Sequence, residues 1–274
     1  MAALEQVDDW DVPTAAAAVV GAGGILAAHG PVERTFPLAS VTKVLFAVAV
    51  HIAVEEGTVG LDDDVAPAGG PEGTTVRHLL AHASGLPPDG ERRPLGPPES
   101  KRIYSNVGFE VLGDHLAART GMTAAEYVGA ALVDTLGLAT TTVQGSPAHG
   151  YASSVTDLAT LLSAVVSGGV LAAESLAAMT SVAFPDLAGV LPGFGGQDPN
   201  PWGLGVEVRG HKSPHWTAAR NTPETWGHFG RSGTFLWWDP AAGLGLVVLT
   251  DREFGPWAAT AWPALSAAVL DEHR

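Results

Sequence analysis

An apolar run occupies residues 44–54, where His51 is the one polar side chain. A run of this length that stops at Gly57 predicts a buried helix over about residues 40–56. The run is too short to cross a bilayer, which takes about 20 helical residues. We therefore expect a helix in the protein core.

Apolar segments near both ends of the chain predict strands. After a short N-terminal helix, residues 14–30 have the pattern of two strands around a glycine-rich turn at residues 21–24. Segments 233–239 and 243–250 flank "PAAG", which is typical of a hairpin connection. Segment 202–208, "WGLGVEV", is a further strand candidate.

The middle of the chain favours helices. Apolar positions recur there at helical spacing, and Thr123 with Glu126 has the spacing of a capping box. The predicted helices cover residues 75–85, where Ser84 and Gly85 end the helix, and then 105–121, 123–138, 153–169 and 172–181, with a closing helix at 257–274.

Strands at both ends around a helical middle predict an α+β fold. We expect one antiparallel sheet built from the N- and C-terminal segments, flanked by the terminal helices, with an inserted helical lobe. The predicted boundaries are 1–60 and 190–274 for the sheet lobe and 61–189 for the helical lobe, with the active site between them. Two loops rich in Pro and Gly, 87–100 and 185–201, are candidates for the walls of that cleft.

Composition narrows the class of protein. The chain has 274 residues and is 46% hydrophobic, which favours an ordered globular protein over disorder. Its formal net charge of −15 disfavours nucleic acid and anionic membranes as partners. There is no cysteine, so disulfides, thiolate metal sites and a cysteine nucleophile are excluded. The first eleven residues carry four acidic side chains and no basic one, unlike a secretory signal, so we expect a cytoplasmic protein.

Candidate chemistry begins where the apolar helix begins. Ser40 and Lys43 are three residues apart, so on a helix they share one face. A lysine whose pKa is lowered by burial and by the positive end of the helix dipole can take the proton of a serine hydroxyl. The alternative is structural, with Ser40 as a helix N-cap and Lys43 extending to solvent.

Two more short motifs favour the catalytic explanation of Ser40 and Lys43 over the structural one. Tyr104 and Asn106 stand two residues apart just before a predicted helix, and His228 and Gly230 lie in a predicted strand. A glycine in a strand lets a ligand approach the backbone closely. Taken alone, each of these residues also has an ordinary structural explanation.

In this order, the three motifs resemble those of the serine β-lactamase and penicillin-binding superfamily. The resemblance extends to the segments "FPLASVTKVLFAVAVHIAVEEGTVGLDDDV", "TVRHLLAHASGLP", "YSNVGFEVLGDHLAARTG" and "GHFGRSGTFLWWDPAAGLGLVVLTD" and covers nearly the whole chain. It is closest to class C β-lactamases, D-stereospecific peptidases and β-lactamase-like esterases.

The resemblance implies a role for each residue. Ser40 would be the acylated nucleophile, Lys43 its general base, and Tyr104 a proton relay to the leaving group, as a phenol or as a phenolate. Asn106 would orient the substrate amide or acyl chain. The remaining implied site residues are His228 on the substrate-binding strand, Gly230, and Arg231, whose backbone N–H would form the oxyanion hole with that of Ser40.

Some residues depart from the family pattern. His228 stands where a lysine is common, and a neutral histidine would bind the carboxylate of a penicillin less well. Phe229 replaces a small hydroxyl residue. Trp226, Trp237 and Trp238 surround this strand, which would fit an apolar acyl pocket, although strand tryptophans more often belong to the core.

Other classes of function remain to be compared. His78 and His82 are spaced as metal ligands on a helix, but the glutamate of a metalloprotease motif is absent; His211 and His215 flank a proline. A nucleophile elbow is also missing, because no Gly-x-Ser-x-Gly exists. A non-catalytic, penicillin-binding-like sensor is the main alternative to an enzyme.

The sequence thus predicts a serine hydrolase of the β-lactamase-like superfamily that forms an acyl-enzyme on small esters or amides. Carboxylesterase and D-aminoacyl peptidase or amidase activity both fit, and weak β-lactamase activity is compatible with the same machinery. We expect a small-molecule acyl substrate, no cofactor, no metal, no nucleic acid and no membrane partner.

Overall fold

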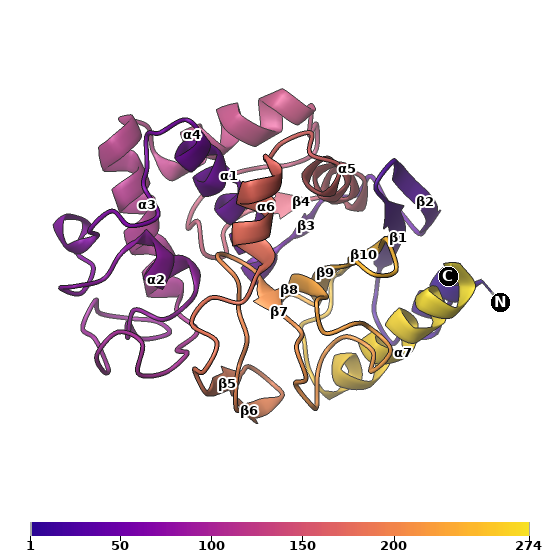
Figure 1. The fold of residues 1–274 in the computed structure, drawn as a ribbon. Coiled ribbons are helices and arrows are strands. Elements are labelled where there is room, and N and C mark those ends of the chain that lie inside the picture. The colour runs from indigo at the N-terminus through magenta and orange to yellow at the C-terminus, as the bar shows by residue number, and fades with distance from the viewer. Residues whose placement is uncertain (1, 274) are drawn as a thin grey trace.

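A computed structural model describes residues 2–273, and its centre is a six-stranded antiparallel sheet (Figure 1). The strand order β2-β1-β10-β9-β8-β7 joins segments from both ends of the chain. This confirms the predicted α+β fold. The strands are β1 (Ala15–Gly21), β2 (Gly24–His29), β7 (Glu207–Val208), β8 (Trp226–Gly230), β9 (Thr234–Asp239) and β10 (Leu244–Thr250).

Both faces of the sheet are covered. The terminal elements η1 (Ala3–Asp9) and α7 (Pro256–His273) pack on one face, and the helical middle of the chain packs on the other (Figure 1). Alternate residues of β10 serve the two cores, so Val247 lies in one and Val248 in the other. This double burial explains why the C-terminal strands are continuous apolar runs rather than alternating ones.

The remaining elements are mainly helices. They are η2 (Ala39–Val41), α1 (Thr42–Glu55), η3 (Ala66–Ala68), α2 (Val76–Leu80), α3 (Asn106–Thr120), α4 (Ala124–Val128), the π-helical turn η4 (Gly129–Asp134), α5 (Val155–Val166) and α6 (Ala173–Thr180). Two small two-stranded sheets join β3 (Phe36–Pro37) with β4 (Ala152–Ser153) and β5 (Gly189–Leu191) with β6 (Gly195–Gln197). The lobe boundaries near residues 60 and 190 stay a prediction.

Helix α1 is the core helix that the apolar run predicts. From Thr42 to His51 every residue is buried. The polar His51 is accommodated because its Nε2 lies 2.9 Å from the backbone carbonyl oxygen of Leu204, to which it donates. Burial also lowers the pKa of His51, which favours the neutral ring. The hydrogen bond ties α1 to the segment that leads into β7.

Two predicted elements are shorter than the sequence indicates. The helix at residues 75–85 ends at Leu80, because His82 takes a left-handed backbone conformation with φ of 55°. In segment 202–208 only Glu207 and Val208 form a strand. Gly205, with φ of 115°, interrupts the extended backbone there and lets the chain pass close to Ala47 of α1.

The contact between α7 and the sheet supplies a stability test. The Trp237 indole donates to Ser266 Oγ at 3.1 Å in the buried interface. Ser266→Ala should leave a buried donor unpaired and lower the free energy of unfolding by about 1–3 kcal/mol, measured by urea denaturation. In a Trp237→Phe background the same substitution should cost much less. An equal cost in both backgrounds would contradict the role of the hydrogen bond.

Candidate active site

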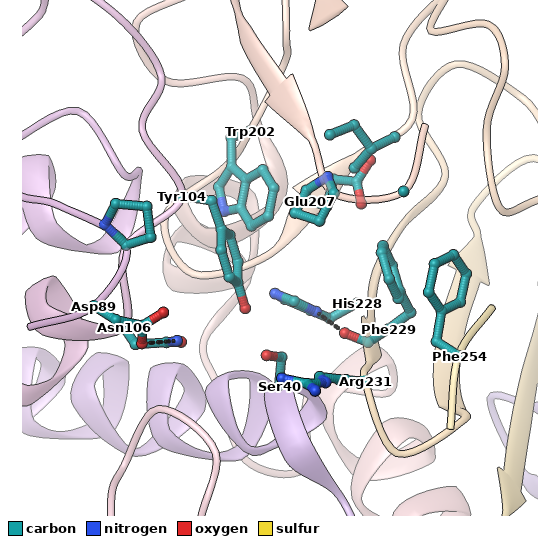
Figure 2. Close-up of a pocket in the computed structure, with 14 residues that line it drawn as sticks. Ser40, Asp89, Tyr104, Asn106, Trp202, Glu207, His228, Phe229, Arg231 and Phe254 are labelled. Atoms are coloured by element: carbon teal, nitrogen blue, oxygen red, sulfur yellow. Dashed lines mark hydrogen bonds between the residues drawn. The ribbon is translucent and has the colours of Figure 1, made fainter. Parts of the chain in front are cut away.

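A pocket of about 390 Å³ lies where β8, the start of α1, the start of α3 and two loops meet (Figure 2). Its lining includes five of the residues that the sequence motifs predict, namely Ser40, Tyr104, Asn106, His228 and Arg231. Pro88 from one predicted wall loop and Leu191 to Gly193 from the other also line it. The volume suits a small molecule.

Ser40 is held by the backbone rather than acting as a helix cap. It lies in the single turn η2, and Ala39 before it has φ of 46°, a left-handed conformation that is strained for a residue with a side chain. Thr234 Oγ1 donates to the carbonyl oxygen of Leu38 at 2.8 Å. This contact fixes the segment on the N-terminal side of Ser40 against the sheet.

Gly230 makes this close approach possible. A Cβ atom at Gly230 would lie 2.3 Å from the carbonyl oxygen of Leu38, far inside van der Waals contact. The glycine therefore brings the end of β8 against the segment before Ser40. Arg231 follows directly, is exposed and lies beside Ser40 in Figure 2. The oxyanion-hole role of the Ser40 and Arg231 backbone N–H groups stays a prediction.

Lys43 is fully buried beneath the pocket. Its Nζ donates to Asn106 Oδ1 at 2.6 Å and to the carbonyl oxygen of Ala148 at 2.8 Å. Burial lowers the pKa of Lys43 to about 7, although Asp89 and Glu110 act in the opposite direction. Lys43 does not extend to solvent, and a large fraction of it is a neutral amine near pH 7.

Tyr104 stacks over Lys43, with the Nζ atom 4.7 Å from its ring centre. Its hydroxyl is buried and has no hydrogen-bond partner of acceptable geometry among residues 2–273, although Figure 2 shows it directed toward Ser40 and His228. Burial raises the pKa of Tyr104, and the neighbouring Ser40 hydroxyl offsets only part of that rise. These surroundings favour a neutral phenol over a phenolate.

His228 lies in β8 with a defined tautomer. Its Nδ1 is 2.6 Å from the carbonyl oxygen of Phe229, and since a carbonyl only accepts, Nδ1 carries the hydrogen. Nε2 is then an acceptor directed into the site (Figure 2). Burial, assisted by the nearby Lys43, lowers the pKa of His228 to about 3. The ring is thus neutral and offers no cation to a substrate carboxylate.

Asn106 is engaged by the protein on both sides of its amide. The Asn106 side chain is available for these contacts because Ser105 caps α3. Ser105 Oγ accepts a hydrogen bond from the Gly108 N–H at 2.9 Å. Asn106 Oδ1 accepts from Lys43, and its Nδ2 donates to Asp89 Oδ1 at 2.8 Å (Figure 2). The sequence analysis did not single out Asp89, which lies in a loop and belongs to no motif.

One end of the pocket is apolar. Leu191, Pro192, Phe229 and Phe254 line it, and the Phe229 and Phe254 rings lie 5.1 Å apart. Gly193 is required there, because a Cβ atom would lie 2.4 Å from the Phe254 ring. This end of the pocket fits a hydrocarbon group of a ligand.

The three strand tryptophans do not form that apolar end. Trp226 and Trp238 belong to the core on the helical side of the sheet, and Trp237 to the core beneath α7. The expectation that they form an acyl pocket is wrong, because successive strand side chains alternate between the two covered faces. Trp202, which precedes β7, is the tryptophan that lines the pocket.

A buried ionic cluster supports the wall near Trp202. Glu207 Oε1 accepts from Lys212 Nζ at 2.6 Å and from His215 Nε2 at 2.8 Å, and Oε2 accepts from the Trp216 indole at 2.7 Å. Burial alone would raise the pKa of Glu207, but Lys212 and His215 hold it below its usual range. Sequence spacing gave no signal for this cluster, although Lys212 is one of only three lysines.

Three of the four histidines considered as metal ligands have separate partners. His78 Nε2 contacts Glu99 at 3.0 Å, His82 Nδ1 accepts from the Ser105 N–H at 3.1 Å, and His215 pairs with Glu207. Within residues 2–273 no group of three or more histidine or acidic side chains is arranged to hold a metal ion. In the same part of the chain, no helix is both long and apolar enough to cross a membrane.

Comparison with known proteins gives the family of this chain. The model of the β-lactamase family matches residues 2–270. The structure of a β-lactamase from Mycobacterium bovis is 49% identical in sequence, with 99% of both chains covered and a TM-score of 0.95.

More distant relatives share the fold or part of the sequence. EstCE1, a hydrolase with promiscuous acyltransferase activity, has 18% identity over 98% of this chain and 96% of its own, and a TM-score of 0.81. An uncharacterized protein of Alkalihalophilus pseudofirmus is 32% identical over 102 residues, which are 35% of this chain and only 30% of that relative. With its family match over nearly the full length, this chain belongs to the β-lactamase family of serine-hydrolase-like proteins.

Proposed function

We propose that this protein is a serine hydrolase that cleaves small esters or amides through an acyl-enzyme on Ser40. The observation that carries this proposal is the buried Lys43 amine one turn from Ser40, with its pKa lowered to about 7. A neutral amine has two N–H groups and one lone pair. Asn106 and Ala148 accept the two N–H groups, so the lone pair is left for the proton of Ser40.

The remaining residues supply the other parts of acyl transfer. Ser40 Oγ attacks the substrate carbonyl as Lys43 takes its proton, and the backbone N–H groups of Ser40 and Arg231 stabilise the oxyanion. Tyr104, a neutral phenol, passes a proton to the leaving group and is reprotonated from Lys43. Water then attacks the acyl-enzyme by the same steps in reverse and releases the acid.

The pocket favours simple esters and amides over penicillins. A penicillin carries a carboxylate, which binds most strongly to a positively charged side chain. His228 is neutral and presents a lone pair, so it does not attract this carboxylate. The apolar end formed by Leu191, Phe229 and Phe254 fits a short hydrocarbon group. The alternative is a binding protein without turnover, and the availability of a neutral Lys43 base favours catalysis over it.

Removal of the nucleophile is the first test. Ser40→Ala should lower hydrolysis of p-nitrophenyl butanoate by about 10³-fold or more, because it removes the proposed nucleophilic hydroxyl. Intact mass spectrometry after fluorophosphonate treatment should show one adduct on the wild type and none on the variant. Ser163→Ala, in helix α5 and outside the pocket lining, should keep both activity and adduct. Near-normal activity of Ser40→Ala with an unchanged Tm would remove Ser40 from the mechanism.

The pH dependence tests Lys43 as the base. Because only the neutral amine accepts a proton, the acylation rate should rise with pH through a midpoint near the Lys43 pKa of about 7. Lys43→Arg, which stays protonated, should lose about 10²-fold or more at every pH. His228→Asn should keep the acidic limb, since the pKa of His228 is only about 3. Loss of the limb in His228→Asn, with normal rates in Lys43→Arg, would make histidine the base.

Substrate preference provides the third test. For the wild type, kcat/KM for p-nitrophenyl butanoate should exceed kcat/KM for nitrocefin and benzylpenicillin, because His228 gives their carboxylate no positive partner. Steady-state kinetics on one purified preparation measures all three values. Fast nitrocefin turnover with little ester cleavage would reverse this ranking, and a stable penicillin adduct without turnover would favour the binding-protein alternative.

A further inference from the structure

Asp89 provides a polar group at the pocket that no sequence motif includes. Asn106 uses its carbonyl oxygen for Lys43 and one amide hydrogen for Asp89 Oδ1. The amide is therefore fixed within the protein, and the Asp89 carboxylate extends beyond it on the side of the pocket away from Phe254 (Figure 2). At this position a ligand meets the Asp89 carboxylate, which only accepts hydrogen bonds, and the second hydrogen of the Asn106 amide.

The position of Asp89 is built into the fold. The Asn106 backbone N–H donates to the carbonyl oxygen of Pro88 at 2.9 Å, and Ser105 Oγ donates to that of Pro87 at 2.6 Å. Both bonds attach the loop immediately before Asp89 to the first residues of α3. The carboxylate is therefore held beside Asn106 although its side chain is exposed to solvent.

The Asp89 carboxylate forms no direct ion pair among residues 2–273, although its charge is felt by Lys43 behind Asn106. Among residues 2–273, no Lys, Arg or His nitrogen lies within 4 Å of its carboxylate. The other carboxylate at the pocket, Glu207, is paired with Lys212 at 2.6 Å. A pocket that keeps one carboxylate unpaired is suited to a ligand that brings a positive group.

We propose that Asp89 is a specificity-determining residue that binds a free amino group of the substrate, next to the carbonyl that Ser40 attacks. The substrates of this site are then aminoacyl esters or amides with an unblocked amine. This inference rests on the proposed acyl-enzyme function and selects among its substrates.

Matched substrates test this proposal on the whole protein. Alanine methyl ester, as the D and the L form, is compared with methyl 2-methylpropanoate, in which a methyl group replaces the ammonium group. The released acids are quantified by mass spectrometry at a fixed pH of about 7, where the Lys43 base is partly neutral. The quantity compared is the ratio of kcat/KM for the amino ester to that for its neutral counterpart.

Two variants distinguish binding of the substrate amino group by Asp89 from the effect of a nearby carboxylate on the Lys43 pKa. Asp89→Asn keeps an acceptor oxygen for Asn106 but removes the charge. Glu110→Gln is the matched control, since Glu110 also raises the Lys43 pKa but does not line the pocket. The other groups that face Lys43 are Asn106, Tyr104 and the two neutral rings His82 and His228. Since Asp89 and Glu110 both raise the pKa of Lys43, removing either charge should shift the acidic limb of the pH–rate profile to lower pH.

The expected result is a change of the ratio in one variant alone. Asp89→Asn should lower the ratio about tenfold for at least one enantiomer, a modest effect because the carboxylate is exposed. Glu110→Gln should keep the wild-type ratio. An unchanged ratio in Asp89→Asn, with normal cleavage of p-nitrophenyl butanoate, would overturn the role of Asp89 and leave the hydrolase function intact. Absence of both ester cleavage and a Ser40 adduct in the wild type would overturn the proposed function itself.

Discussion

The burial of one amine is the constraint on which the site depends. Lys43 lies at the start of α1, a helix that is buried on all sides, and the cost of keeping a charge there brings its pKa to about 7. The same burial requires that its hydrogens be accepted, which Asn106 and Ala148 do. A fold that encloses α1 between the sheet and the other helices therefore favours the neutral amine that the proposed base role of Lys43 requires.

The other groups of the pocket are consistent with that requirement. Tyr104 and His228 are buried in their neutral forms, and Glu207 directs its charge to Lys212 and His215. Among the residues that the structure describes, Asp89 and Glu110 act on Lys43 through their charge, and both favour its ammonium form. The pKa of Lys43 lies near neutrality because a large desolvation effect is partly offset by a smaller attraction to Asp89 and Glu110. Small changes in the loop that carries Asp89 should therefore shift the pKa of Lys43.

The sequence predicted the parts of the structure that depend on local spacing. Ser40 and Lys43 share one helical turn, and the strand and helix patterns gave the sheet built from both chain ends. The sequence did not predict Asp89, whose position depends on hydrogen bonds between the Pro87–Pro88 backbone and the start of α3. It also did not predict the Glu207 cluster, which forms among side chains of residues 207–216, where most of the chain is irregular and no spacing rule applies. It also misplaced Trp226, Trp237 and Trp238, since both faces of the sheet are buried and the apolar pattern does not show which face meets the pocket.

The fold explains why the sequence predicted some residues of the pocket and not others. Lys43, Asn106 and His228 lie on helices and a central strand, where packing fixes each side chain, and the strained Ala39 and the absent side chain of Gly230 set Ser40 against that frame. Asp89, Leu191 and Phe254, by contrast, come from the connecting loops and the short β5 strand, and they line the pocket. The motifs therefore predict the residues of the proposed acyl transfer, whereas the proposed choice of substrate depends on which loop residues the backbone brings to the pocket. Because the exposed Asp89 carboxylate changes both the charge of the pocket and the pKa of Lys43, the two proposals imply that a single residue outside every motif couples recognition to catalysis.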